Sequence, residues 1–359
     1  MKKRLSLKLA LLGLAVAFTL TLASAAGAQP GEWVNGVLQP LADGFPDRAI
    51  TFIVIDDPGS RDGIYARTMQ RSLKDKCPVE ILISDEPAAT LGTFYTLRDT
   101  ISRKGGKEGY YPAVVTMFGN VTDLLLEPIT KETGMDASMI KGIIRTETYP
   151  QILLQRKNAP WGPSFVNLLK YAYDNPGKLR YISLDVGSGG DIGCEWMMNH
   201  LGMKVKKIPQ PGSTAVIRTV GAGDGDFGMA GADTAIIGWD SGRIEPLILW
   251  GQSTKIPEPW TNYQRIITYQ QAGFDLPVPN LSSLGWAVNN LVPDSHVDWL
   301  YKLFEAGAKT ELHKMREKQI PGLEIDIIGP KETNAEKMYM LKVADPVLRR
   351  IGLHIDMQK

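Results

Sequence analysis

The sequence YISLDVGSGGDIGCEWMMNHL, residues 181–201, decides the fold of this chain. A short apolar run ends at Leu184, glycines lie at positions 187, 189 and 190, and apolar residues then recur at helical spacing. This pattern predicts a strand, a tight turn and a helix. The first turn of a helix has unpaired backbone N–H groups and the positive end of the helix dipole, so it favours an anion such as carboxylate or phosphate. The alternative interpretation is that the glycines only allow a sharp turn and that Asp191 caps its own helix.

A similar turn occurs early in the chain. Residues 49–55 (AITFIVI) are a β-branched run typical of a strand that is buried on both faces. They lead directly into residues 56–63 (DDPGSRDG), which are followed by apolar residues at helical spacing. The chain is therefore predicted to contain two strand–turn–helix units that could share one bound anion.

Short apolar runs alternate with helical patterns along the rest of the sequence, which predicts an α/β fold with parallel strands. The run at residues 139–156 is broken at Tyr149-Pro150 and is long enough to pass from one lobe to another. Residues 251–279 are rich in proline, as a connection back would be. We expect two lobes, with the carboxyl ends of parallel strands from both lobes facing a cleft between them.

The predicted division of the chain is a signal peptide at 1–28, a first lobe made of 29–147 and 268–359, and a second lobe at 148–267. Removing 28 of the 359 residues leaves 331, which is more than one core usually serves. Residues 29–48 are rich in Pro, Gly and Asn and are expected to form a leader arm. Residues 103–109 (RKGGKEG) are expected to form a charged surface loop.

The first 28 residues have the features of a secretory signal. A basic start is followed by the uncharged apolar run Leu9–Ala23, and Ala26-Gly27-Ala28 has the small-x-small form of a cleavage site. The alternative is an N-terminal anchor, but the apolar run is short for a membrane span. We therefore expect export, with cleavage near Ala28.

Charge and composition exclude several classes of function. The full chain has 40 basic and 39 acidic residues, and four of the basic ones lie in the signal, so the mature chain carries a formal charge of −3. No basic excess remains for nucleic acid. Cys77 and Cys194 are expected to be separate thiols in different lobes. The four histidines lack metal-binding spacing, so we expect neither a metal nor a cofactor.

Signatures of catalysis are also missing from the sequence. It contains no nucleophile elbow and no phosphate-binding P-loop motif. One G-x-G-x-x-G occurs at Gly223, Gly225 and Gly228, but it is expected to follow a helix and precede a strand, the wrong context for a dinucleotide. The acidic residues at 224, 226, 233 and 240 lack the spacing of a calcium loop, and solvated turn residues are the better interpretation.

The candidate site consists of main-chain amides, which glycine allows a ligand to approach, and of hydroxyls that complete the hydrogen bonds. Arg61 could add a bidentate clamp on a carboxylate, or it could form a surface pair with Asp57 or Asp62. The candidate ligand-binding residues are Asp57, Pro58, Gly59, Ser60, Arg61, Gly63, Gly119, Ser183, Gly187, Ser188, Gly189, Gly190, Asp191, Gly212, Ser213 and Asp233.

Taken together, these segments resemble a known family, the periplasmic solute-binding receptors of tripartite tricarboxylate transporters, also called Bug-type receptors. The matches extend over nearly the whole mature chain. They are residues 50–67 ending in Ala66-Arg67, Gly109-Tyr110, Asn175-Pro176-Gly177-Lys178-Leu179 before Tyr181, Val186-Gly187-Ser188 with Glu195, Pro209 with Gly212-Ser213, and Gly285 with Val292-Pro293.

The resemblance implies a two-lobed periplasmic binding protein of type II, a Venus flytrap, without enzymatic activity. It also implies a periplasmic monomer that binds a small organic carboxylate and delivers it to the permease subunits of the transporter. Carried onto this chain, the two facing turns are Pro58 to Gly63 and Val186 to Asp191. Two other functions stay open: presentation of the ligand to a membrane sensor, and an enzyme on a flytrap scaffold.

This chain departs from the family pattern in its acidic residues. Aspartates stand at positions 56, 57, 85, 185 and 191, where the family has glycine, proline or histidine. Because like charges repel, these carboxylates argue against a simple tricarboxylate unless Arg61 or water intervenes. A ligand with an amino group, or a mostly apolar monoacid, would be repelled less.

Overall fold

The computed structural model describes most of the chain. The described residues are 29–55, 60–86, 90–116, 121, 124–125, 127–184, 189–210, 212–250, 266–273, 283–320, 322–350 and 352. Among them, no helix is both long enough and apolar enough to cross a membrane.

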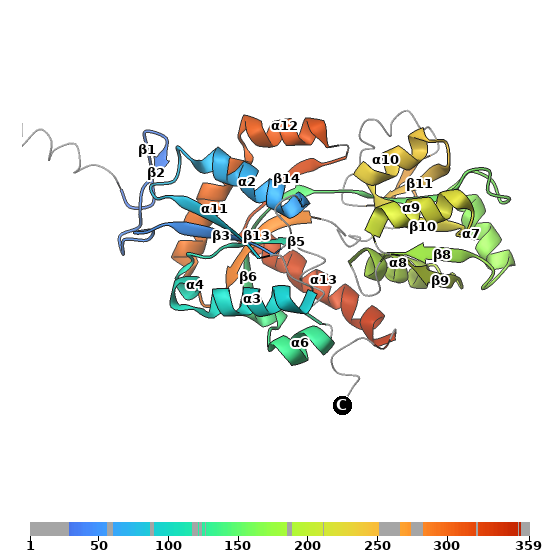
Figure 1. Cartoon of the computed structure of the whole chain (residues 1–359), viewed down its shortest axis with the longest axis horizontal. Coiled ribbons are helices and arrows are strands. Elements are labelled where there is room, and N and C mark those ends of the chain that lie inside the picture. The colour runs from blue at the N-terminus through green and yellow to red at the C-terminus, as the bar shows by residue number, and fades with distance from the viewer. Residues whose placement is uncertain are drawn as a thin grey trace, which may run out of the picture.

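The described residues form two lobes, each built on a six-stranded mixed sheet (Figure 1). The first sheet has the order β14-β6-β13-β5-β3-β4, in which β3 lies parallel to β4 and β5, and β13 lies antiparallel to β5 and β6. Its strands are β3 (Ile50–Val54), β4 (Ile81–Asp85), β5 (Ala113–Thr116), β6 (Ile140–Thr148), β13 (Ser283–Asn289) and β14 (Glu324–Ile328).

The second sheet has the order β12-β11-β7-β10-β8-β9. Strand β8 lies parallel to both β9 and β10. Strand β7 lies antiparallel to β10 and β11. The strands are β7 (Gln151–Arg156), β8 (Arg180–Ser183), β9 (Lys206–Pro209), β10 (Phe227–Gly231), β11 (Ile244–Trp250) and β12 (Ile267–Thr268). The chain thus passes from one sheet to the other between Thr148 and Gln151, at the predicted break.

Helices cover both sheets (Figure 1). Those of the first lobe are α2 (Arg61–Leu73), α3 (Thr90–Ser102), α4 (Lys104–Glu108), α6 (Glu127–Thr133), the 3₁₀ turn η1 (Ala137–Met139), α11 (Asp294–Ala308), α12 (Glu311–Gln319) and α13 (Pro330–Arg350). Those of the second lobe are α7 (Phe165–Asp174), α8 (Gly189–His200), α9 (Gly212–Ala222) and α10 (Ala232–Asp240).

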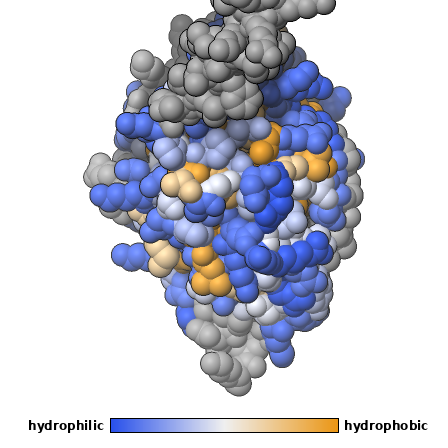
Figure 2. Space-filling model, turned by 90° about the vertical axis from the view of Figure 1, so that its left-hand side faces the viewer, coloured by the Kyte–Doolittle hydropathy of each residue, from blue (hydrophilic) through white to orange (hydrophobic). Residues whose placement is uncertain are grey.

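The core of the first lobe is aromatic. Trp286 of β13 stacks on Phe304 of α11, with ring centroids 4.8 Å apart, and Phe52 of β3 packs 4.3 Å from the same tryptophan. All three side chains are fully buried. The outer end of this lobe is mostly hydrophilic, and its hydrophobic residues form separate small spots (Figure 2).

Helix α13 connects the two lobes. It begins beside β6 in the first lobe, and its second half packs on α8 of the second lobe (Figure 1). Met340, Ala344 and Leu348 belong to one buried cluster with Met197 of α8 and Trp250 of β11. The position of this helix across both lobes was not predicted from the sequence.

Two local predictions are wrong. The expected leader arm contains a short hairpin, β1 (Trp33–Val34) with β2 (Val37–Leu38), and it packs on the first lobe. Phe45 stacks on His296 at 4.0 Å, which gives this segment a buried anchor. The expected charged loop at 103–109 contains helix α4. This helix packs closely against the end of α3. A Cβ atom at Gly106 would lie 2.3 Å from the carbonyl oxygen of Ile101, so only glycine fits at this position.

Candidate functional site

Several candidate residues fall outside the described residues: Asp57, Pro58, Gly59, Gly119, Gly187 and Ser188. The described candidates lie at helix starts and strand ends. Ser60, Arg61 and Gly63 lie at the start of α2, Gly189, Gly190 and Asp191 begin α8, and Ser183 ends β8. Gly212 and Ser213 begin α9, and Asp233 is the second residue of α10.

The carboxyl ends of the parallel strands in both sheets lie at the crossing between the lobes. In the first sheet, the last residue of β5, Thr116, pairs with Leu284, which in turn pairs with Glu147 near the end of β6. In the second sheet, the last residue of β10, Gly231, pairs with Gln151, the first residue of β7. Helices that follow these parallel strands therefore begin on the sides of the lobes that face each other.

Two of these helix starts contact the crossing itself. The guanidinium carbon of Arg61, in the first turn of α2, lies 4.4 Å from the centroid of the Tyr149 ring. From the second lobe, the backbone N–H of Ala232, the first residue of α10, donates to the carbonyl of Pro150 at 3.1 Å. The first turns of α2 and α10 are thus held on two adjacent residues, although 171 positions separate Arg61 from Ala232 along the chain.

The predicted hydroxyls have structural partners. Ser60 is the N-cap of α2, and its Oγ accepts a hydrogen bond from the N–H of Gly63 at 3.1 Å. Ser213 Oγ accepts from the N–H of Gly231 at 3.1 Å and so fixes the start of α9 to the end of β10. Each of these hydroxyls still has a proton to donate to a ligand. Ser183 is fully buried, and its Oγ has no hydrogen-bond partner within the described part of the chain.

Among the aspartates that depart from the family pattern, the two that the structure describes, Asp85 and Asp191, each have a basic partner. Asp191 is fully buried, and Lys207 Nζ of β9 lies 2.6 Å from its carboxylate and 3.2 Å from that of Glu195. Asp85, at the end of β4, pairs with Arg67 of α2 at 2.5 Å. These pairs reduce the negative charge that Asp85 and Asp191 present to an anionic ligand. Asp56 and Asp185 lie outside the described residues, as does Asp57.

Asp226, one of the acidic residues considered above as a calcium ligand, also has basic partners. Asp226 accepts hydrogen bonds from the backbone N–H and the guanidinium of Arg180 at 2.8 to 3.1 Å, and it pairs more distantly with Arg156. Asp226 thus lies at a bend before β10, but the prediction of a solvated residue is wrong, because its side chain is buried and paired with arginines.

The structure contains a buried ionic cluster at the crossing that the sequence did not predict. The Glu147 carboxylate accepts hydrogen bonds from the phenol of Tyr149 and from the guanidinium of Arg316 at 3.0 and 3.1 Å, and His313 Nδ1 lies 3.1 Å from it. Burial alone would raise the pKa of Glu147, but the hydrogen bonds from His313 and Arg316 lower it to about 2. His313 and Arg316 lie more than 160 positions from Glu147 along the chain, so no local pattern could reveal the cluster.

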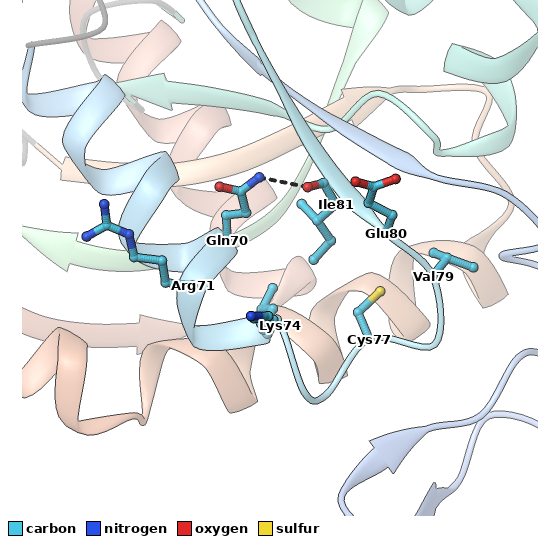
Figure 3. Close-up of a pocket in the computed structure, with 8 residues that line it drawn as sticks. Gln70, Arg71, Lys74, Cys77, Val79, Glu80 and Ile81 are labelled. Atoms are coloured by element: carbon cyan, nitrogen blue, oxygen red, sulfur yellow. Dashed lines mark hydrogen bonds between the residues drawn. The ribbon is translucent and has the colours of Figure 1, made fainter.

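A cavity of about 470 Å³ lies elsewhere in the first lobe (Figure 3). It is lined by residues from the end of α2, the connection after it and the start of β4, among them Gln70, Lys74, Cys77 and Ile81. Gln70 Nε2 donates to the carbonyl of Ile81 at 2.7 Å across one side of it. Because Ser60 and Arg61 lie at the opposite end of α2, this cavity is separate from the candidate site. Cys77 here and Cys194 in α8 are both free thiols.

Comparison with known proteins gives a direct match to a family. Residues 65–265 match the family described as "Tripartite tricarboxylate transporter family receptor", and this segment is more than half of the chain. The chain belongs to this receptor family. Members of the family are periplasmic solute-binding receptors and not enzymes. The matched segment runs from α2, through the crossing, to the end of the second lobe.

The chain is also similar to individual proteins and solved structures. A UPF0065 protein of Bordetella pertussis is 29% identical over 172 residues, which are 48% of this chain and 50% of that protein. The chain thus spans about half the length of this curated relative. The crystal structure of a TctC solute-binding protein from Polaromonas has a TM-score of 0.67 at 18% identity, covering 84% of this chain and 99% of that one.

A second similar solved structure is that of a Rhodopseudomonas palustris protein with adipate. Its TM-score is 0.62 at 18% identity, and the match covers 86% of this chain and 99% of that one. At such identities the likeness concerns the fold, and the predicted two-lobed type II fold is confirmed.

Proposed function

We propose that this protein is a periplasmic solute-binding receptor that captures a small organic carboxylate between its lobes. The observation that carries the proposal is the meeting of the α2 and α10 first turns at Tyr149-Pro150, with the Arg61 guanidinium at 4.4 Å from the Tyr149 ring. Helix N-termini from both lobes, together with one guanidinium, form a setting that favours an anion. Membership of the receptor family supports this function.

Binding and closure follow from this arrangement. A carboxylate that accepts hydrogen bonds from both lobes binds the closed form better than the open form, so it shifts the population toward closure. Each hydrogen bond to a charged group contributes roughly 1.5–3 kcal/mol, so three or four are enough for micromolar affinity after the cost of association. The lobes that close are proposed to be 29–147 with 268–359, and 148–267. The receptor is proposed to act as a monomer.

A dicarboxylate is the ligand class that we favour. Lys207 pairs with Asp191 and Arg67 pairs with Asp85, so these two aspartates oppose a ligand with more than one negative charge less than unpaired carboxylates would. The adipate in the Rhodopseudomonas palustris relative is a ligand of this class. Arg61 and the helix N-termini of the second lobe would each take one carboxylate end.

The closed receptor is proposed to deliver its ligand to the permease subunits of a tripartite tricarboxylate transporter. Family membership supports this partner. Export through the predicted signal at residues 1–28 would place the receptor in the periplasm, where such a permease is accessible.

The proposal is tested by calorimetry and thermal unfolding of the purified mature protein with adipate, succinate and citrate. We expect one of these acids to bind at micromolar concentration and to raise the unfolding temperature. Gly190→Val, which crowds the first turn of α8, should abolish that rise while leaving the ligand-free protein folded. Absence of binding by every acid, or an unchanged rise in the Gly190→Val variant, would contradict the proposal.

A further inference from the structure

Tyr149 lies between a candidate ligand-binding group and a buried ionic cluster. One face of its ring carries the guanidinium of Arg61 at 4.4 Å. Its phenol donates to the carboxylate of Glu147 and accepts from Arg316 at 2.8 Å. The ring is 5% exposed, and the phenol is bonded on both sides, so the ring has little freedom to turn.

The far side of this cluster is helix α12, which supplies none of the candidate ligand-binding residues. Arg316 reaches both carboxylate oxygens of Glu147, and His313 of the same helix reaches one of them. His313 also packs edge-on against Tyr65 of α2, with ring centroids 5.9 Å apart. Helix α12 lies beside α2 and β14 in the first lobe (Figure 1). It therefore holds both the crossing and the helix that carries Arg61.

We propose that Tyr149 is a positioning residue that holds the Arg61 guanidinium at the cleft, and that α12 fixes Tyr149 through Glu147 and Arg316. This inference rests on the proposed function, because it assigns the place of a group in that same site. A guanidinium on an aromatic face is attracted by the ring quadrupole, and this attraction restrains the position of its side chain. A long arginine side chain held in this way loses less freedom when the ligand binds.

The positioning is measurable without any ligand. The side chain of Arg61 lies over an aromatic ring, so its NMR signals in the full mature protein should be shifted upfield by the ring current. Arg61→Lys assigns these signals. Tyr149→Leu should remove the shift, and Tyr149→Phe, which keeps the ring but loses its anchor, should give an intermediate value. Unshifted Arg61 signals in the wild type would overturn the proposal, and a wild-type shift in Tyr149→Phe would overturn the role of the anchor.

A second pair of an arginine over a tyrosine ring serves as the control. Arg48 lies over the ring of Tyr110 at 3.7 Å, and the Tyr110 phenol is bonded to Asp47. Tyr110→Leu should shift the signals of Arg48 and leave those of Arg61 unchanged. A change in the Arg61 signals of this variant would show that loss of any buried tyrosine disturbs them, and would overturn a specific role for Tyr149.

The effect on binding is tested by a double-mutant cycle with the acid of the adipate, succinate and citrate panel that binds most tightly. Arg61→Ala and Tyr149→Leu should each lower the affinity by roughly threefold to thirtyfold, and the double variant should be no weaker than Arg61→Ala alone. Additive losses would overturn the proposal, because Tyr149 would then act independently of Arg61. If no acid binds the wild type, the proposed function fails, and the ligand-free NMR result alone decides the role of Tyr149.

Discussion

Lys207 Nζ lies 2.6 Å from the carboxylate of Asp191, which is fully buried in the first turn of α8. This pair joins the helix start to strand β9 of the same lobe. It reduces the negative charge of an aspartate that occupies a helix N-terminus proposed to face an anionic ligand, although Lys207 also pairs with Glu195 of the same helix. The pair therefore supports both the fold of the second lobe and the electrostatics of the proposed site.

Replacing Lys207 should lower the stability of the folded protein. Lys207→Met leaves Asp191 buried without its cation, and loss of one partner of a buried pair typically costs about 3–5 kcal/mol. We expect a decrease of this order in the free energy of unfolding, measured by urea denaturation. Lys206→Met, on the same strand but exposed, is the matched control and should have little effect. Equal stabilities of the two variants would contradict the structural role of the pair.

The pH dependence of stability should report on Glu147. Its pKa in the folded protein is about 2, against an ordinary value of 4.5, so its stabilising contribution is complete above pH 4.5 and is lost as the pH falls through about 2. The difference in unfolding free energy between the wild type and Glu147→Gln should therefore shrink across this window, by an amount on the order of 3 kcal/mol. Asp240→Asn, at an exposed carboxylate of α10, is the control. A difference that stays constant down to pH 2 would refute the assignment.

Replacing each of two serine N-caps should distinguish an effect on the free energy of unfolding from an effect on ligand affinity. Ser60 caps α2 beside the crossing, and Ser164 caps α7, where its Oγ accepts from the N–H of Asn167 at 3.3 Å. Each Ser→Ala change should lower the free energy of unfolding by about 1 kcal/mol. Only Ser60→Ala should also weaken binding of the carboxylate in calorimetry, because α7 follows β7, which runs away from the crossing. Equal effects of both variants on affinity would argue against a site at α2.

The connection that α13 makes between the lobes predicts a position-specific loss of stability. Met340 is fully buried in the cluster that includes Met197, whereas Met338, two positions earlier, is 61% exposed. Met340→Ala should cost about 2–5 kcal/mol in urea denaturation. Met338→Ala should cost little. Similar values for the two variants would contradict the packing of α13 on the second lobe.

Features that depend on local pattern could be predicted from the sequence. The β-branched run at 49–55 became β3, and strand β8 and helix α8 lie before and after residues 185–188, as expected. The break at Tyr149-Pro150 marks the passage between the sheets. In each case the signal is carried by neighbouring residues, so a single stretch of sequence was enough.

Features that depend on distant residues could not be predicted. The sequence placed Asp191 at a helix start but gave no sign of Lys207 as its partner, because the pairing requires β9 to lie beside β8. The cluster around Glu147 joins β6 to α12 for the same reason. The candidate site was predicted as two turns facing each other. The described residues add Tyr149 and Pro150 as the place where the two lobes meet.

Hydrogen exchange, measured with and without the carboxylate that binds most tightly, shows directly whether the ligand lies between the two lobes. We expect the ligand to slow exchange of backbone amides in the first turns of helices from both lobes, α2 in one and α8 or α10 in the other. Protection confined to one lobe, or protection around the cavity of Gln70, Cys77 and Ile81 instead, would contradict a site between the lobes.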